Sequence, residues 1–403
     1  MKHGVFLPPF FSMKESPNAA LHRSLELMEH LDRLGFDEAW IGEHHSAGME
    51  IIASPELFIA AAAERTKHLR FGTGVVSLPY HNPLMVANRI IQLDHQTRGR
   101  IMFGAGPGLL SSDAWMLDID PNVQRDRMEQ ALGVILRLFR GESVTEKTDW
   151  YSLRDARCHL LPYQDPMPEV AVASAVTPSG GRLAGKYGLG MLCVAAAEGP
   201  GFEVLSTNWN AACEIAEENG RVMDRSRLRL VAPFHIAETR EQAMADVRHG
   251  LQDYIDYTNN NQPRLFVPPG RDAVEWWMEG RRGCIGTPDD AVAAIKALHD
   301  KQGDFGVMLN VIFQWVEPGP LKRSLELYQR YVVPRFDRSN EARRASFDWV
   351  TGHTANFDRQ RKEAAQAAFD KHDRERAASR GETAAPAARG TGGDPQSDAF
   401  LIA

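Results

Sequence analysis

The feature that most constrains the fold is a regular alternation of short apolar runs with longer segments of helical periodicity. The runs are apolar throughout rather than at every second position, which is typical of parallel strands buried on both faces. Eight strand–helix units can be counted, and this number favours an α/β fold of the closed (β/α)8 TIM-barrel type over an open sheet. The expected strands are residues 3–7, 38–41, 69–77, 100–105, 169–173, 189–194, 228–236 and 306–313.

Composition limits the classes of function. The 403 residues are 43% hydrophobic and 25% charged, as in ordinary globular enzymes. A net charge of −7 without a dense basic stripe argues against a nucleic-acid partner. No apolar stretch reaches the length of about 18 residues that a membrane span needs. The four cysteines are too widely spaced for a zinc site and too few for a disulfide scaffold. We therefore expect a cytoplasmic protein without membrane association.

The chain divides into three parts by composition. Residues 1–336 carry the alternating pattern and should form the barrel with its insertions. Residues 337–377 are rich in charge and alanine, which predicts a C-terminal helical extension. Residues 378–403 have no apolar periodicity and are expected to be a disordered tail.

Two segments interrupt the alternation. Residues 149–161 are typical of a small β-hairpin, and residues 259–283 form a long excursion that contains Trp276 and Trp277. Loops longer than about 15 residues in compact domains are usually functional or disordered. The aromatic pair favours a lid over an apolar substrate, while packing against a neighbouring subunit is the alternative.

Polar and glycine-rich residues follow four successive strands, in residues 43–45, 78–83, 104–108 and 174–181. Catalytic groups of a parallel barrel lie at the carboxyl ends of its strands, so these loops predict one shared site. In the second loop, His81 and Asn82 are candidate substrate or lid contacts.

His44 is the candidate catalytic residue. A histidine can act as acid, base or hydrogen-bond donor near neutral pH. Because successive strand residues point to opposite faces, only one of His44 and His45 should face the barrel mouth. Alternatively, His44 packs in the barrel wall and bonds a backbone carbonyl.

Two neighbouring strands lack side chains at two positions each, because they contain Gly72 and Gly74 and, in the next strand, Gly104 and Gly106. Glycine in a strand often marks the close approach of a ligand, so the pair of strands predicts a slot for a planar ring. Relief of barrel curvature is the alternative. A dinucleotide motif is excluded because Leu109 occupies the place of its third glycine.

A candidate anion site precedes the helix that begins near residue 178. Thr177 and Ser179 offer hydroxyls, and Gly180 and Gly181 would let a ligand approach the helix N-terminus. Such an end suits the phosphate of a mononucleotide. An ordinary Ser/Thr N-cap is the alternative.

Seven segments, spread from residue 1 to about 336, resemble the bacterial-luciferase-like flavin-dependent monooxygenases. They read MKHGVFLPPF, GFDEAWIGEHH, LRFGTGVVSLPYHNP, LDHQTRGR, FGAGPG, SAVTPSGGRLAGKYGLG and IGTPDDAV. The fifth-strand motif resembles limonene-monooxygenase-type members more than light-emitting enzymes.

The resemblance implies FMN, reduced to FMNH2, at the barrel mouth. A non-prolyl cis peptide at Gly74–Val75 would lie beneath the isoalloxazine, near Gly106. Thr177, Ser179, Gly180 and Gly181 would hold the phosphate, and His44 would be the essential histidine.

The sequence departs from the luciferases at two places. Gly106 and Pro107 replace a cysteine and an arginine, and Ala195 stands near a tryptophan position. These changes argue against light emission. They also predict a weakly held flavin that has lost one cationic partner of its phosphate.

The implied reaction is that of a two-component monooxygenase. A separate NAD(P)H:flavin reductase would supply FMNH2, O2 would form a C4a-(hydro)peroxyflavin, and one oxygen atom would enter a small apolar organic substrate. Electrophilic and nucleophilic transfer both stay open. The resemblance also implies a homodimer.

Three other functions fit parts of the pattern. The first is F420-dependent hydride transfer on the same barrel, and the second is a non-catalytic flavin-binding relative. The third is a metal-dependent hydrolase that would use Glu43, His44, His45 and Asp94, although no zinc-binding motif is present.

Overall fold

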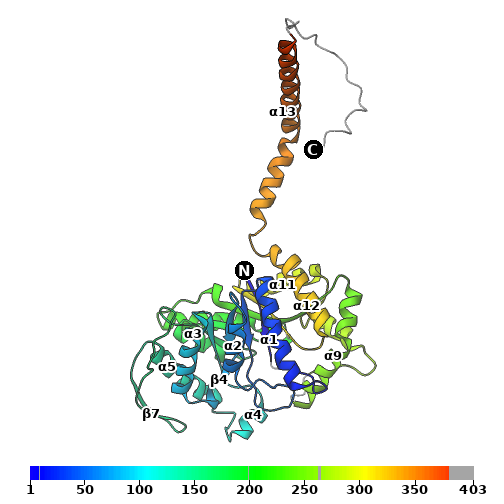
Figure 1. Cartoon of the computed structure of the whole chain (residues 1–403). Coiled ribbons are helices and arrows are strands. Elements are labelled where there is room, and N and C mark those ends of the chain that lie inside the picture. The colour runs from blue at the N-terminus through cyan, green and yellow to red at the C-terminus, as the bar shows by residue number, and fades with distance from the viewer. Residues whose placement is uncertain (9, 198, 262–264, 381–403) are drawn as a thin grey trace. The chain divides into compact units, whose positions relative to one another are not determined.

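The computed structural model describes residues 1–380, except for residues 9, 198 and 262–264. Within the described residues, eight parallel strands form a closed barrel, because β1 pairs with both β2 and β12. The closed sheet has no free edge, and the predicted (β/α)8 fold is confirmed (Figure 1). In barrel order, the strands are β1 (Lys2–Leu7), β2 (Glu38–Ile41), β3 (Arg70–Thr73), β5 (Ile101–Gly106), β8 (Glu169–Ser174), β9 (Gly190–Cys193), β10 (Leu228–Ile236) and β12 (Val307–Val311).

Helices cover the outside of the barrel. Many begin at a proline, which suits the first helical turn because it lacks the N–H that would stay unbonded there. Except for the helix Arg240–Asn261, whose buried residues belong to a second cluster, their inner faces and the outer faces of the strands share one large hydrophobic core. The main helices are α1 (Pro17–Leu34), α2 (Pro55–Glu64), α3 (Pro83–Thr97), α5 (Gln124–Phe139), α6 (Ser179–Tyr187), α8 (Leu205–Glu218), α9 (Arg240–Asn261), α11 (Pro288–Gln302) and α12 (Pro318–Leu327).

A separate cluster fills the inside of the barrel, and Trp40 is its largest member. A Cβ at Gly72 or Gly104 would overlap the indole ring of Trp40 or the backbone beside it. The glycine-thinned strands therefore do receive a planar ring, but it is the side chain of Trp40. This corrects the expectation of an open slot at these two glycines.

A buried ion pair closes the amino-terminal end of the barrel. Arg229 Nε lies 2.8 Å from Glu38 Oε2, and both side chains are almost fully buried. The indole N–H of Trp40 donates to the same carboxylate, and the Arg229 guanidinium stacks over the Trp40 ring. The ligand-binding space must therefore lie at the opposite, carboxyl-terminal end of the strands.

The insertions differ in detail from the sequence-based expectations. The hairpin starts earlier than predicted and consists of β6 (Val144–Lys147) and β7 (Ser152–Ala156). The excursion at 259–283 is partly helical, because α9 extends to Asn261 and α10 spans Ala273–Glu279; residues 262–264 lie outside the described part.

Several elements did not emerge from the sequence pattern. They include α10, α11, the short strand β11 (Cys284–Gly286) and the short helix α4 (Ser111–Met116). A capping box, in which Thr287 and Asp290 bond each other's backbone N–H, starts α11 and would have identified it from sequence.

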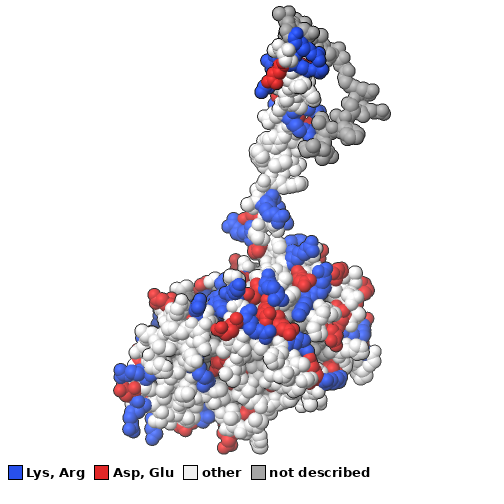
Figure 2. Space-filling model, viewed as in Figure 1, with Lys and Arg blue, Asp and Glu red and all other residues white. Residues whose placement is uncertain are grey.

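Residues 339–403 form a second unit by themselves, in which helix α13 spans Glu341–Ser379 and has no buried residue. Most of the predicted disordered tail, residues 381–403, lies outside the described residues. In the part of the chain that the structure covers, no helix is long and apolar enough to cross a membrane. On the face seen in Figure 2, basic and acidic side chains are interspersed.

Candidate active site

A cavity of about 420 Å³ opens at the carboxyl-terminal end of the barrel, where the strand ends or the loops that follow them all contribute to its wall. Its volume is within the usual range of small-ligand sites, about 300–1,000 Å³. Six predicted site residues line it, namely His44, Gly74, Val75, Thr177, Ser179 and Gly180. Six others do not, namely Gly106, Gly181, His81, Asn82, Trp276 and Trp277.

His44 is held between two carboxylates. Its Nδ1 atom lies 3.1 Å from Asp113 Oδ2, and its Nε2 atom lies 3.1 Å from Glu50 Oε2. The ring is 14% exposed, and Glu50 shares the cavity wall with it. Because both ring nitrogens have an acidic partner, the plane of the ring is fixed and each nitrogen has a route for a proton.

Asp113 comes from α4 and organises the loop after β2. It is almost fully buried, and it accepts hydrogen bonds from the backbone N–H of His45 and from the Ser46 hydroxyl. Burial acts to raise the pKa of Asp113, but the hydrogen bonds from His44 and Ser46 outweigh it and hold the pKa below its usual range. Asp113 is thus an anion beside His44, and no sequence motif marked it.

His45 points away from the cavity, as the alternation along the strand predicted. Its Nε2 atom lies 2.9 Å from Glu43 Oε1, and His81 Nε2 lies 2.8 Å from the same oxygen. Burial would raise the pKa of Glu43, but the hydrogen bonds from the two histidines lower it overall. This network ties the loop after β2 to the loop that carries His81, so His81 supports the site rather than lining it.

The metal-hydrolase alternative is not supported by the geometry. Asp94 is buried and accepts hydrogen bonds from Gln164, while His44 is bound to Asp113 and Glu50. Among the described residues, one group has ligand spacing, Glu43 with His45 and His81, and direct hydrogen bonds already satisfy its three atoms.

The Gly74–Val75 peptide is cis, as expected, and both residues form part of the cavity wall. Gly106 lies behind them, where a Cβ would overlap the Val75 side chain. Gly106 therefore makes room for the Val75 side chain within the wall.

The predicted anion site lies at the start of α6. The hydroxyls of Thr177 and Ser179 are 2.9 Å apart, and the N-cap position is Pro178, which has no side-chain cap. The alternative of a Ser/Thr N-cap is therefore not observed, and both hydroxyls are available to a ligand. The reason why positions 180 and 181 are glycine differs from the predicted approach of a ligand. A Cβ at Gly180 would overlap the carbonyl oxygen of Ala173, and a Cβ at Gly181 would overlap that of Asn208.

Arg125, in the first turn of α5, is a wall residue that sequence reasoning missed. It is exposed, and no ion pair joins it to a described residue. A cation in the first helical turn opposes the helix dipole, so an anion nearby would relieve an unfavourable arrangement. Arg125 is thus a cation on the wall of the same cavity as Thr177 and Ser179.

Aromatic side chains form the apolar wall. Phe10, Tyr254, Tyr257 and Phe313 line the cavity, and the rings of Tyr254 and Phe313 are 4.3 Å apart. Trp277 is buried behind Tyr254, with 6.1 Å between the ring centroids.

The remaining predicted lid residues have structural contacts outside the cavity wall. Trp276 lies under the guanidinium of Arg282. Asn82 caps α3 through a hydrogen bond from the backbone N–H of Leu84.

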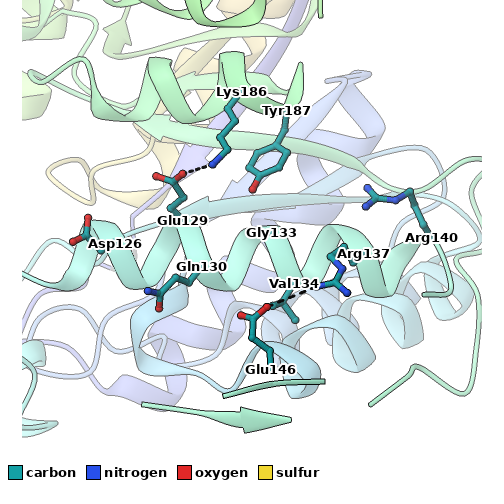
Figure 3. Close-up of a pocket in the computed structure, with 10 residues that line it drawn as sticks. All are labelled: Asp126, Glu129, Gln130, Gly133, Val134, Arg137, Arg140, Glu146, Lys186 and Tyr187. Carbon is teal, nitrogen blue, oxygen red and sulfur yellow. Dashed lines mark hydrogen bonds and ion pairs between the residues drawn. The ribbon is translucent and has the colours of Figure 1, made fainter. Parts of the chain in front are cut away.

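A second hollow, of about 520 Å³, lies on the outside between α5 and the end of α6 (Figure 3). Its charges are largely paired, since Lys186 Nζ is 2.6 Å from Glu129 and Arg137 is 3.7 Å from Glu146. None of the strand-end residues that were singled out above contributes to it. We assign this groove no role in the chemistry.

The barrel matches a solved structure over nearly its whole length. The oxygenating constituent of 3,6-diketocamphane monooxygenase from Pseudomonas putida, a type II Baeyer–Villiger monooxygenase solved in complex with FMN, has a TM-score of 0.69. The match covers 83% of this chain and 98% of that one at 24% identity, so this likeness shows the fold alone.

Sequence comparisons identify the family. Limonene 1,2-monooxygenase from Rhodococcus erythropolis is 48% identical over 335 residues, which are 83% of this chain and 86% of that protein. 4-Hydroxyprotoasukamycin monooxygenase from Streptomyces nodosus subsp. asukaensis is 44% identical over 356 residues, 86% of this chain and 95% of that protein. The model of the luciferase-like monooxygenase family matches residues 1–304. The chain belongs to the luciferase-like monooxygenase family.

Proposed function

We propose that this protein is the oxygenase component of a two-component system, which uses FMNH2 and O2 to insert one oxygen atom into a predominantly apolar organic substrate. The observation that supports this most is the shared cavity. His44, the Thr177–Ser179 anion site and the aromatic wall all open onto the same space. A flavin phosphate, its ring system and a substrate need these three environments together.

The residues present fit FMN. Thr177, Ser179 and Arg125 would hold the phosphate, because two hydroxyls that bond each other, a helix N-terminus and a cation line the same cavity. Gly74 and Val75 would support the ring system. When bound in its reduced form, this cofactor supplies the activation of dioxygen.

His44 would hold and move a proton at the reacting centre. Asp113 fixes Nδ1, so proton exchange with the cavity would run through Nε2 and its neighbour Glu50. Glu50 lines the same cavity, which makes it a candidate to return the proton.

The aromatic wall would exclude water during the reaction. Phe10 and Phe313 present only carbon to the cavity, and their neighbours Tyr254 and Trp277 back them with further apolar surface. Exclusion of water suppresses loss of the activated oxygen as hydrogen peroxide.

We further propose a separate flavin reductase as a partner, and a homodimer as the assembly. The structural relative from Pseudomonas putida is named an oxygenating constituent, which supports the assignment of oxygenation and flavin reduction to separate proteins. Exposed Leu57 on α2 and Met85 on α3 give an apolar surface near the early strands that could pair with a second copy.

The test is anaerobic titration of the full chain with photoreduced FMN and, in parallel, with reduced F420. Oxygenated buffer and limonene are then added, and the oxygenated product and hydrogen peroxide are quantified. We expect binding of reduced FMN and formation of product. Binding of reduced F420 without binding of reduced FMN, and without oxygenated product, would instead show that the protein is a hydride-transfer enzyme.

Replacement of Arg125 by alanine should weaken FMN binding about tenfold, because a hydrogen bond to a charged group is worth about 1.5–3 kcal/mol and exposure reduces it. The measurement is the dissociation constant of FMN compared with that of riboflavin, which lacks the phosphate. The matched control is Arg127→Ala, which lies on the same helix as Arg125 and removes a cation that is paired with Asp149 of the β6–β7 turn. Equal weakening of FMN and riboflavin would show that Arg125 does not bind the phosphate.

A further inference from the structure

Three potential metal ligands lie together beside the cavity. One ligand atom from each of Glu43, His45 and His81 lies within 4.8 Å of the other two. Glu43 belongs to the cavity wall, whereas the two histidines do not line it. The proposed function uses none of the three side chains in the chemistry, so a ligand of this cluster would be distinct from flavin and substrate.

The distances allow an ion to enter after a small adjustment. His45 Nε2 is 2.9 Å and His81 Nε2 is 2.8 Å from the same atom, Glu43 Oε1. Ligand atoms that bind zinc at about 2.1 Å are roughly 3.4 Å apart in tetrahedral geometry. Each histidine would therefore move away from the oxygen by roughly half an ångström. The ion would take the place of the two hydrogen bonds that join the histidines to Glu43.

The backbone around the cluster already orients two of the ligands. Glu43 Oε2 accepts a hydrogen bond of 3.2 Å from the backbone N–H of Ser77, so the other carboxylate oxygen is directed at the histidines. Asp113 accepts a hydrogen bond from the backbone N–H of His45. Outer contacts of this kind hold metal ligands in place, and the loss of one typically lowers metal affinity about 10–100-fold.

Exposure and donor chemistry indicate the class of ion. The side chains of His45 and His81 are 24% and 22% exposed, so an ion can enter from solvent and keep water as a further ligand. Two imidazoles with one carboxylate suit divalent transition metals such as Zn²⁺ and Co²⁺. Mg²⁺ and Ca²⁺ instead prefer oxygen ligands.

We propose that Glu43, His45 and His81 bind one divalent transition-metal ion, of which Zn²⁺ is the representative. The ion joins the loop after β2 to the loop that carries His81, and it takes no part in oxygen transfer. Because His44 lies between two of the ligands in the chain, the ion holds its backbone from both sides. Binding requires neither flavin nor substrate, so the site is independent of the proposed function.

Titration of the flavin-free full chain with Co²⁺ tests the site, because the visible absorption of Co²⁺ changes when histidine replaces water as a ligand. We expect one equivalent per chain to stay bound through gel filtration, and Zn²⁺ but not Mg²⁺ to displace it. His45→Ala and His81→Ala should each weaken binding at least about 100-fold, because losing a ligand costs no less than losing an outer contact. The matched control is His95→Ala, which removes an exposed histidine that contacts the carbonyl of Leu161.

Thermal unfolding separates loss of the site from loss of the fold. Saturating Zn²⁺ should raise the unfolding temperature of the wild type and of His95→Ala, but not of the other two variants, because a ligand stabilises the state that binds it. If an alanine variant does not fold in the presence of a chelator, His81→Gln replaces it, since glutamine can still donate to Glu43. The proposal is wrong if no equivalent of Co²⁺ stays bound, or if binding persists when His45 or His81 is replaced.

Discussion

Replacement of His44 by alanine should lower the yield of oxygenated product at least about 100-fold, the usual contribution of a positioned acid–base group. Reduced flavin should still be consumed by O2, but its electrons should appear as hydrogen peroxide. The reason is that both carboxylates around His44 stay in place while the group that moves a proton between them and the cavity is gone. Product and peroxide are quantified per FMNH2 oxidised.

The variant His44→Gln separates proton transfer from positioning. Glutamine can still bond to a carboxylate, but it does not titrate. We expect both variants to be uncoupled and to bind FMN within about threefold of the wild type, since the proposed phosphate contacts are elsewhere. Unchanged coupling in either variant would remove His44 from the mechanism.

Replacement of Ser179 by aspartate should weaken FMN binding about 100-fold. Two like charges about 4 Å apart near a protein surface repel by up to about 4 kcal/mol, and partial exposure lowers this figure. Ser179 lies at the start of α6, beside the Thr177 hydroxyl, so a carboxylate here would face the proposed phosphate directly. The dissociation constant of FMN is measured at low and at high salt.

Two comparisons show whether charge is the cause. Ser179→Asn has nearly the same shape as the aspartate variant without its charge, and it should lose much less affinity. Riboflavin should bind Ser179→Asp nearly as well as it binds the wild type. If the aspartate variant holds FMN as tightly as the asparagine variant does, the phosphate lies elsewhere.

The sequence carried enough information to predict the barrel because its strands are buried on both faces and are therefore mostly apolar rather than apolar at every second position. Helix α11 was missed because its start signal, Thr287 with Asp290, lies directly after the short strand β11 and the irregular excursion before it. The excursion also hid α10, which begins with an Asp272 cap. Local capping chemistry was present in both cases, but the apolar pattern alone did not separate these elements.

The candidate site was predictable only where one loop carries several chemical groups. His44 and the Thr177–Ser179 hydroxyls belong to such loops. Asp113 does not, since it is 69 residues away from His44 in the chain and meets it through α4. Arg125 and Tyr257 likewise stand alone on helices, where a single polar residue cannot be told apart from an ordinary surface position.

The tryptophans show the opposite error. Trp276 and Trp277 attracted attention because a pair of large aromatic residues in a long loop suggests a lid. In the structure Trp277 packs behind Tyr254, so its effect on the cavity is indirect. Sequence identifies which residues are large and apolar, whereas the side of the wall on which they lie depends on how α9 and α10 pack.

The close contacts at Gly180 and Gly181 affect how homologous sequences should be used to trace flavin binding. Both positions exclude a side chain because of the backbone of β8 and α8, whether or not a cofactor is present. A descendant that had lost the cofactor would therefore retain both glycines for as long as it kept its barrel. No such backbone contact requires the hydroxyls of Thr177 and Ser179. In a relative that no longer binds flavin, these hydroxyls should therefore be lost before the two glycines.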